Sequence, residues 1–223
     1  MKKICDIEII NPVQTENGFV FMTPKSNDGE NTVINYKIYD FSTNEITPVT
    51  RSVYLLNKFG INFESFQGSF KRYLNCNIIG LPAKRQAVID DKGLVEIYDN
   101  FSTVLLSKEL CYDSEAPCDA FCTGNDIWMS YKNSACLIKY SVSGLIQQFR
   151  IGGKSLDSFG TPEGIWADEK KVLFCDSKNH KISQIDLDEF EISDYFLFDE
   201  PVHKYFKYKA DEIVFLDSGA YIL

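Results

Sequence analysis

A unit of four short strand-like segments recurs along this sequence, and this repetition constrains the fold more than any other feature. The clearest copy begins at Pro162, and turn-forming Asp, Glu, Lys, Asn or Ser residues separate its segments. The four segments cover residues 162–168, 172–177, 181–187 and 192–198. Each has the length of a β-strand, so the unit predicts an antiparallel meander of four strands.

Other copies of this unit are visible before and after it. Two of them begin at Pro117 and Pro201, and the phrase Ile-Tyr-Asp recurs at residues 38–40 and 97–99 in the N-terminal half. We therefore predict five units with one insert between the first two. The units cover approximately residues 4–54, 73–110, 117–151, 162–199 and 201–223, and the insert, a long connection or one helical turn, covers residues 55–72.

Repetition of whole sheets predicts an all-β propeller of about five blades, formed by residues 1–223 as a single domain. A four-stranded sheet cannot bury both faces alone, and radial packing of several sheets solves this problem. The 17 Phe and 12 Tyr residues suit such half-buried sheets. The last unit ends near its third strand, so the last blade either lacks an outer strand or takes it from residues 4–10. The second option competes with residues 4–10 forming the first strand of the first unit.

The charge of the chain restricts the class of partner. The 32 acidic and 23 basic residues give a formal net charge of −9. Such a surface repels phosphate backbones and anionic lipid, so we expect neither nucleic-acid nor membrane binding. Asp6 and Glu8 interrupt the apolar residues near the N-terminus, which excludes a signal-peptide core there.

The cysteines favour a reducing compartment. Their number is odd, seven, which predicts free and mostly buried thiols in a cytoplasmic protein. Cys111, Cys118 and Cys122 lie close together, but their spacing is not that of a usual zinc site and no histidine is near. We expect these three to lie in the core or in turns.

Residues 162–187 resemble an NHL-type propeller repeat, in which a proline and a glycine open one strand and a later strand ends in Asp-Ser-x-Asn-His-x-Ile. Repeats of the YWTD type and blades of streptogramin-lyase-like propellers are similar over the same stretch. The resemblance implies a propeller in which Asp176 and Asn179 hold a turn through local backbone hydrogen bonds. A lyase role for His180 would need further matching residues. Propellers of these families include enzymes, receptors and protein-binding platforms, so the resemblance does not define the function.

Three polar residues follow the prolines that open successive units: Asp119, Glu163 and His203. The first strand of each propeller blade lines the central channel, so these side chains are expected to meet near the mouth of the channel. There they would bind a ligand, or else bond water and cap blade edges. Trp166 and Trp128 are further candidates, either as a stacking platform at this mouth or as packing between blades.

Our leading interpretation is a non-enzymatic binding propeller without a cofactor, whose partner is a protein, a peptide or a small molecule. Alanine at Asp119, Glu163 and His203 together should then weaken binding and leave folding intact. The alternative is a metal-dependent lactonase or a lyase. Glu163-Gly-Ile-Trp resembles the opening metal-ligand motif of gluconolactonases and SMP30-type lactonases, which implies one Ca²⁺ or Mg²⁺ at Glu163 and Asp119. That motif belongs near the N-terminus of those enzymes, whereas here it comes late.

The sequence is compatible with two oligomeric states. The chain is a monomer, or an unpaired blade edge near Leu223 docks a strand from another chain and forms an oligomer.

Overall fold

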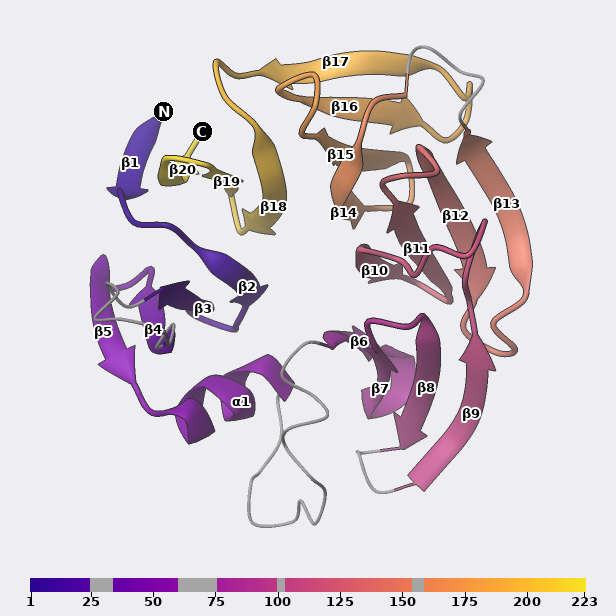
Figure 1. Cartoon of the computed structure of the whole chain (residues 1–223), viewed down its shortest axis with the longest axis horizontal. Coiled ribbons are helices and arrows are strands. Elements are labelled where there is room, and N and C mark those ends of the chain that lie inside the picture. Colours follow the sequence, from indigo (N-terminus) through magenta and orange to yellow (C-terminus); the bar gives the residue numbers. More distant parts are fainter. Residues whose placement is uncertain (25–33, 60–75, 100–102, 154–158) are drawn as a thin grey trace. The chain divides into compact units, whose positions relative to one another are not determined.

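A computed structural model describes the chain except for residues 25–33, 60–75, 100–102 and 154–158 (Figure 1). The described residues form five antiparallel sheets of four strands each, one α-helix and one 3-10 turn, η3 (Pro82–Lys84). In each sheet the strands pair in the order in which they occur along the chain, except that the last sheet also takes a strand from the N-terminus. The fold is therefore a five-bladed β-propeller, as the sequence predicts.

The blades are numbered in chain order. Blade 1 contains β2 (Ile10–Gln14), β3 (Gly18–Pro24), β4 (Ile34–Asp40) and β5 (Glu45–Val49). Blade 2 contains β6 (Asn77–Leu81), β7 (Arg85–Ile89), β8 (Leu94–Asp99) and β9 (Thr103–Glu109). Blade 3 contains β10 (Asp119–Thr123), β11 (Asp126–Tyr131), β12 (Cys136–Ser141) and β13 (Gln147–Gly152). Blade 4 contains β14 (Pro162–Ala167), β15 (Lys171–Asp176), β16 (Lys181–Asp186) and β17 (Ile192–Leu197). Blade 5 contains β18 (Val202–Tyr208), β19 (Asp211–Leu216), β20 (Gly219–Ile222) and β1 (Lys2–Cys5).

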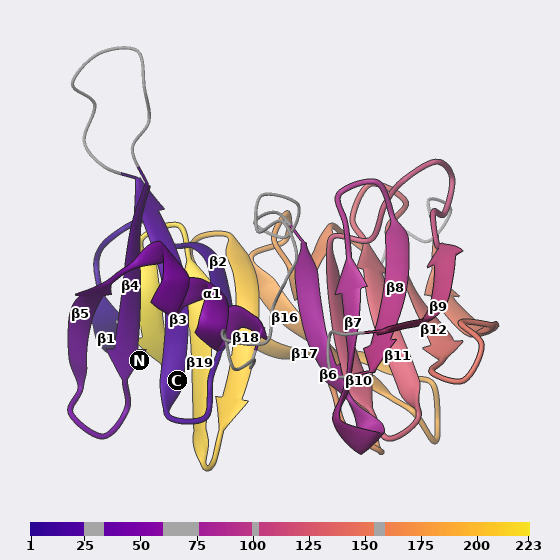
Figure 2. The same cartoon turned by 90° about the horizontal axis from the view of Figure 1, so that it is seen from below.

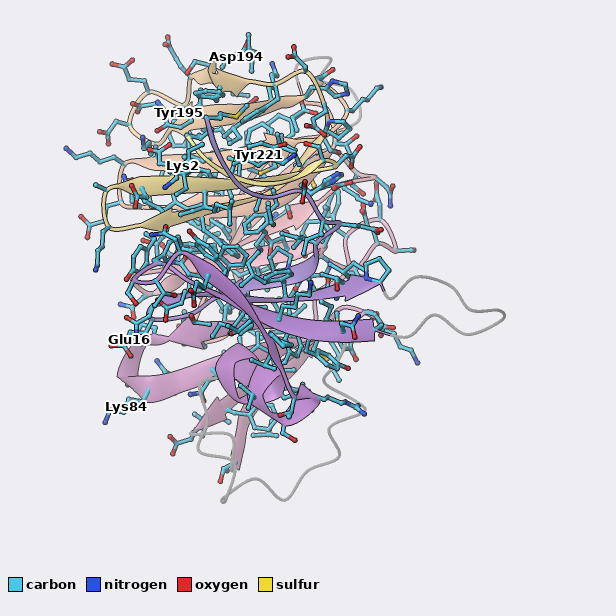
Figure 3. All side chains as sticks on the ribbon, turned by 90° about the vertical axis from the view of Figure 1, so that its left-hand side faces the viewer. Lys2, Glu16, Lys84, Asp194, Tyr195 and Tyr221 are labelled. Carbon is cyan, nitrogen blue, oxygen red and sulfur yellow. The ribbon has the colours of Figure 1, made fainter. Side chains whose placement is uncertain are left out.

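Both ends of the chain contribute to blade 5. Strand β1 pairs antiparallel with β20, and Lys2 lies opposite Ile222 and Lys3 opposite Tyr221 (Lys2 and Tyr221 are labelled in Figure 3). The next strand, β2, begins at Ile10 and is the first strand of blade 1. The two uses predicted as competitors for the N-terminal segment therefore both occur, one after the other along the chain.

The chain divides into two compact units. Residues 1–67 and 206–223 form one, and residues 68–205 form the other, so that β18 passes from the second into the first. The core of the first unit is rich in aromatic rings, including Phe19, Phe21, Tyr39, Phe206 and Phe215. The second unit holds blades 2, 3 and 4 and has two buried apolar clusters, one between blades 2 and 3 and one between blades 3 and 4. The prediction of a single domain stays a prediction.

A helix covers part of blade 1. Helix α1 (Arg51–Phe59) lies against β2, β3 and β4 (Figure 2). Its Tyr54 is fully buried, packs against Tyr36 with tilted rings whose centroids are 5.0 Å apart, and donates a 3.4 Å hydrogen bond to the carbonyl of Asn11. The start of the predicted insert at 55–72 is thus helical, and residues 60–72 lie outside the described part of the chain. No helix among the described residues is long and apolar enough to cross a membrane.

Candidate functional site

The predicted site residues lie at the beginnings of the first strands of blades 3, 4 and 5, and all three belong to the second unit. Asp119 is the first residue of β10, Glu163 the second of β14 and His203 the second of β18. The repeat that places each residue just after a proline therefore also places it at the same end of its blade. The structure joins two of the three directly and gives the third different partners.

Glu163 and His203 form the accessible part of this region. The Nδ1 atom of His203 lies 2.6 Å from Oε2 of Glu163, and the Nζ atom of Lys132 lies 3.3 Å from Oε1. The side chain of Glu163 is 22% exposed, that of His203 41% and that of Lys132 44%. We call these three residues the histidine cluster. It places one carboxylate between two donor groups of neighbouring blades, and all three side chains can be reached from solvent.

The histidine cluster controls the protonation of its carboxylate. The hydrogen bond from His203 holds the pKa of Glu163 below its ordinary value, and the charge of Lys132 acts in the same direction against the effect of partial burial. The carboxylate therefore stays ionised at neutral pH and keeps both contacts.

A pH dependence of stability follows from this lowered pKa. The carboxylate of Glu163 stabilises the folded state fully above its ordinary pKa of 4.5, and that contribution disappears as the pH falls through the lower folded-state value. We expect the free energy of unfolding of the wild type to fall more steeply between pH 5 and pH 3 than that of Glu163→Gln. Urea denaturation at several pH values measures both slopes. Equal slopes in the two proteins would show that the pair contributes nothing.

Asp119 is bound differently and lies out of solvent. It is 4% exposed, its Oδ2 atom accepts a 2.9 Å hydrogen bond from the backbone N–H of Ile165, and its Oδ1 atom accepts one from Nζ of Lys204. One carboxylate on β10 thus holds a backbone group of β14 and a side chain of β18. This burial argues against the expectation that alanine at Asp119, Glu163 and His203 leaves folding intact, because Asp119 fastens three blades together.

Further polar contacts join the same strand ends. The hydroxyl of Ser130 donates a 3.1 Å hydrogen bond to the carbonyl of Glu163, and the thiol of Cys118 lies 3.3 Å from the carbonyl of Pro162. The amide of Asn77, on blade 2, donates a 2.8 Å bond to the carbonyl of Cys118. These contacts link each blade of the second unit to the next and fix the position of Glu163 through its backbone.

Gly164 is required for the close approach of β14 and β18. A Cβ atom at this position would lie 2.6 Å from the carbonyl oxygen of His203 and 3.0 Å from the Cα atom of Lys204. Both are backbone atoms, which cannot move away independently of their strand. The glycine therefore allows Glu163 and His203 to come within hydrogen-bond distance.

The carboxylates already have cationic partners. Glu163 contacts His203 and Lys132, while Asp119 contacts Lys204, so a divalent ion would have to displace these groups. Within the described residues, no group of three His, Cys, Asp or Glu side chains is arranged to hold a metal ion. The observed donor set thus suits ion pairs between side chains better than the Ca²⁺ or Mg²⁺ of the lactonase alternative.

Five of the seven free cysteines lie in environments that disfavour the thiolate. Burial raises the pKa of Cys118 and of Cys136 to about 11, and it also raises that of the fully buried Cys175. Cys111 and Cys122 show raised pKa values as well, with burial as the first cause. Thiolates are the nucleophilic and metal-binding form, so these side chains are not set up for either chemistry.

The two tryptophans differ in accessibility. Trp128 is 1% exposed and belongs to the buried cluster between blades 3 and 4, so it presents no free ring face to a ligand. Trp166 is partly buried, and its ring centroid lies 5.9 Å from that of Phe121 and 6.0 Å from that of Tyr205. Of the pair, only Trp166 retains surface on which a ligand ring could stack.

The Asp176 turn has the predicted bonding. Oδ1 of Asp176 accepts a 3.3 Å hydrogen bond from the backbone N–H of Asn179 and a 2.9 Å bond from that of Thr161, and Oδ2 accepts a 2.7 Å bond from the Asn179 amide. His180, at φ 54°, closes the turn, and its carbonyl accepts a 2.8 Å bond from the N–H of Phe198. The segment acts as a structural turn.

Sequence reasoning missed Lys132 and Lys204. Lys204 had a usable signal: it lies within the partly buried strand β18, where a lysine is stabilised by a charged partner. Lys132 follows the last residue of β11 in a turn, where lysine is common and has no predictive value. Only the arrangement of neighbouring blades reveals its contact with Glu163.

Solved structures resemble this chain through their fold. The crystal structure of the computationally designed Ika4 protein matches with a TM-score of 0.52 and 8% identity, over 73% of this chain and 95% of the designed one. The structure of U3-55K matches with a TM-score of 0.56 and 9% identity over 98% of this chain, and the crystal structure of RRP9 WD40 repeats matches with 0.53 and 8% over 94%. The chain spans 61% and 58% of the lengths of those two proteins.

The shared feature is the propeller. At 8–9% identity these similarities show the fold alone. No family model matches the sequence, and no curated protein matches it. The neighbours and the five sheets agree on the β-propeller fold.

Proposed function

We propose that this chain is a binding propeller whose ligand, a protein or peptide, contacts the histidine cluster at the starts of the blade strands in the second unit. The observation that carries this proposal is the contrast between the two ion pairs on the first strands. Asp119 and Lys204 form an ion pair with little exposure to solvent. The side chains of Glu163, His203 and Lys132, in contrast, are accessible at the surface. Exposed charged groups held by a rigid scaffold are suited to recognition.

The charge of the histidine cluster indicates which ligand group it would take. Lys132 and a protonated His203 share the single carboxylate of Glu163, so the three side chains together then carry a positive excess. An acidic side chain or a C-terminal carboxylate of a peptide would complement it through charge-assisted hydrogen bonds. The chain has a net charge of −9, so the rest of its surface would repel the same acidic ligand and binding would favour this positive site.

Two narrower ideas from the sequence remain proposals. The relation to NHL-type and YWTD-type repeats agrees with the hydrogen-bonded turn at Asp176. A cytoplasmic location agrees with seven free cysteines. The lactonase alternative has less support, because the two carboxylates that it requires are engaged by lysine and histidine.

Selection from a displayed library of random peptides tests the proposed site. Peptides enriched on the wild type should contain acidic residues and should bind the Lys132→Ala/His203→Ala variant at least tenfold more weakly. Lys139→Ala is the matched control, since Lys139 also pairs with a carboxylate at 3.3 Å, that of Asp126, away from the cluster. Affinities come from fluorescence anisotropy. Failure to enrich any peptide, or equal binding by the double variant, would overturn the proposal.

A further inference from the structure

The last strand of each blade ends its sheet, and most of these strands carry residues that discourage pairing with another chain. Proteins protect open sheet edges with proline, lysine and irregular pairing. Strand β5 contains Pro48, β1 contains Lys2 and Lys3, and β13 contains Arg150 together with a register shift. Strand β9 contains Lys108.

Strand β17 lacks the proline and the basic residues of the other last strands. Its sequence, Ile-Ser-Asp-Tyr-Phe-Leu, contains neither, although its pairing with β16 shifts register between Ile182 and Ser183. Its one charged residue, Asp194, is 53% exposed and contacts Nζ of Lys181 on the neighbouring strand β16 at 2.5 Å. Three large apolar residues of the strand are exposed, and Leu197 retains 65% of its surface.

The far side of β17 is open. In the described part of the chain, the sheet order of blade 4 ends at β17, which pairs with β16 alone (Figure 1). An edge strand presents a row of backbone donors and acceptors to a further strand. In β17 these groups run beside exposed apolar side chains, and Figure 3 shows Asp194 and Tyr195 on this blade.

The charge around β17 indicates the occupant. Residues 186–200 contain seven acidic side chains and no basic one, and most of the seven are exposed. The acidic residues are Asp186, Asp188, Glu189, Glu191, Asp194, Asp199 and Glu200. Two copies of this segment would repel one another, which disfavours pairing of β17 with itself. A basic strand would be attracted.

We propose that β17 is a docking edge for an extended, basic segment of a partner protein, which adds to blade 4 as a fifth strand. Backbone hydrogen bonds would join the segment to β17, and its apolar residues would cover Phe196 and Leu197. Its lysines or arginines would pair with the acidic residues on both sides of the strand. This surface is separate from the histidine cluster and does not depend on it.

A synthetic peptide of alternating lysine and valine, eight residues long and fluorescently labelled, is a suitable probe for anisotropy measurements. The wild type should bind it, and Leu197→Lys should weaken binding at least tenfold by placing a positive charge on the edge. Leu105→Lys on β9 is the matched control, because Leu105 is 53% exposed on the last strand of blade 2. That variant should bind like the wild type. Both leucines are at the surface, so both variants should keep the wild-type melting temperature.

Two modified probes separate strand addition from simple attraction. The same peptide with alternate backbone nitrogens methylated keeps its charge and loses hydrogen-bond donors, and it should not bind. If the methylated peptide bound as tightly as the unmethylated one, or if both leucine variants lost the same affinity, charge alone would explain the binding. Either result would overturn the proposal. Sedimentation without peptide must show a monomer. A dimer that Leu197→Lys dissociates would identify a second copy as the occupant and also overturn it.

Discussion

Replacing Asp119 with alanine is expected to lower the free energy of unfolding by about 3 kcal/mol, because it breaks a buried ion pair by removing one partner. The substitution leaves the ammonium group of Lys204 partly buried without its carboxylate. It also leaves the backbone N–H of Ile165 without its acceptor. Urea denaturation of the purified chain, followed by tryptophan fluorescence, measures the change.

Two further variants make the result specific to the buried pair. Asp126→Ala removes a carboxylate that is 30% exposed and pairs with Lys139, and it should cost less than about 1 kcal/mol. Adding Lys204→Met to Asp119→Ala should recover part of the loss, since no unpaired charge then remains. A loss of under about 1 kcal/mol for Asp119→Ala, equal to that of the exposed pair, would show that Asp119 does not hold the blades together.

Replacing Trp128 with alanine is expected to lower the free energy of unfolding by about 4 kcal/mol, as for other large aromatic residues removed from a core. Its ring is almost wholly buried between blades 3 and 4, so the substitution leaves a cavity. Trp166→Ala should cost less, because Trp166 is only partly buried. Denaturation curves of both variants give the comparison.

Peptides selected on the wild type should still bind Trp128→Ala under conditions in which it is folded. If the folded Trp128→Ala variant no longer bound these peptides, Trp128 would belong to the binding site.

The propeller was predictable because each repeating unit can be recognised from short stretches of sequence. In blade 4 the predicted segment at 181–187 contains β16 and the segment at 172–177 overlaps β15, since turn-forming residues mark both ends of each strand. The sequence did not distinguish a helix from a long connection in the insert where α1 ends. The sequence of α1 holds no repeat, and the burial of its Tyr54 depends on contacts with blade 1.

The candidate site was predictable only in part. The repeat predicts Asp119, Glu163 and His203 at equivalent ends of their blades, and they lie at the starts of β10, β14 and β18, while their role in binding stays a prediction. It gave no information on burial, because two carboxylates one repeat apart look alike in sequence. The difference arises from what faces each one: a backbone N–H and Lys204 for Asp119, and the exposed side chains of His203 and Lys132 for Glu163.

The pairing of β1 with β20 has a consequence for the order in which the sheets form. Lys2 and Ile222 face each other although they lie far apart in the sequence, whereas the strands of blades 1 to 4 pair with their immediate neighbours along the chain. Contacts between distant residues require a long loop to close and form more slowly than local ones. Blade 5 is therefore expected to be the last sheet to be completed, when β1 joins β20.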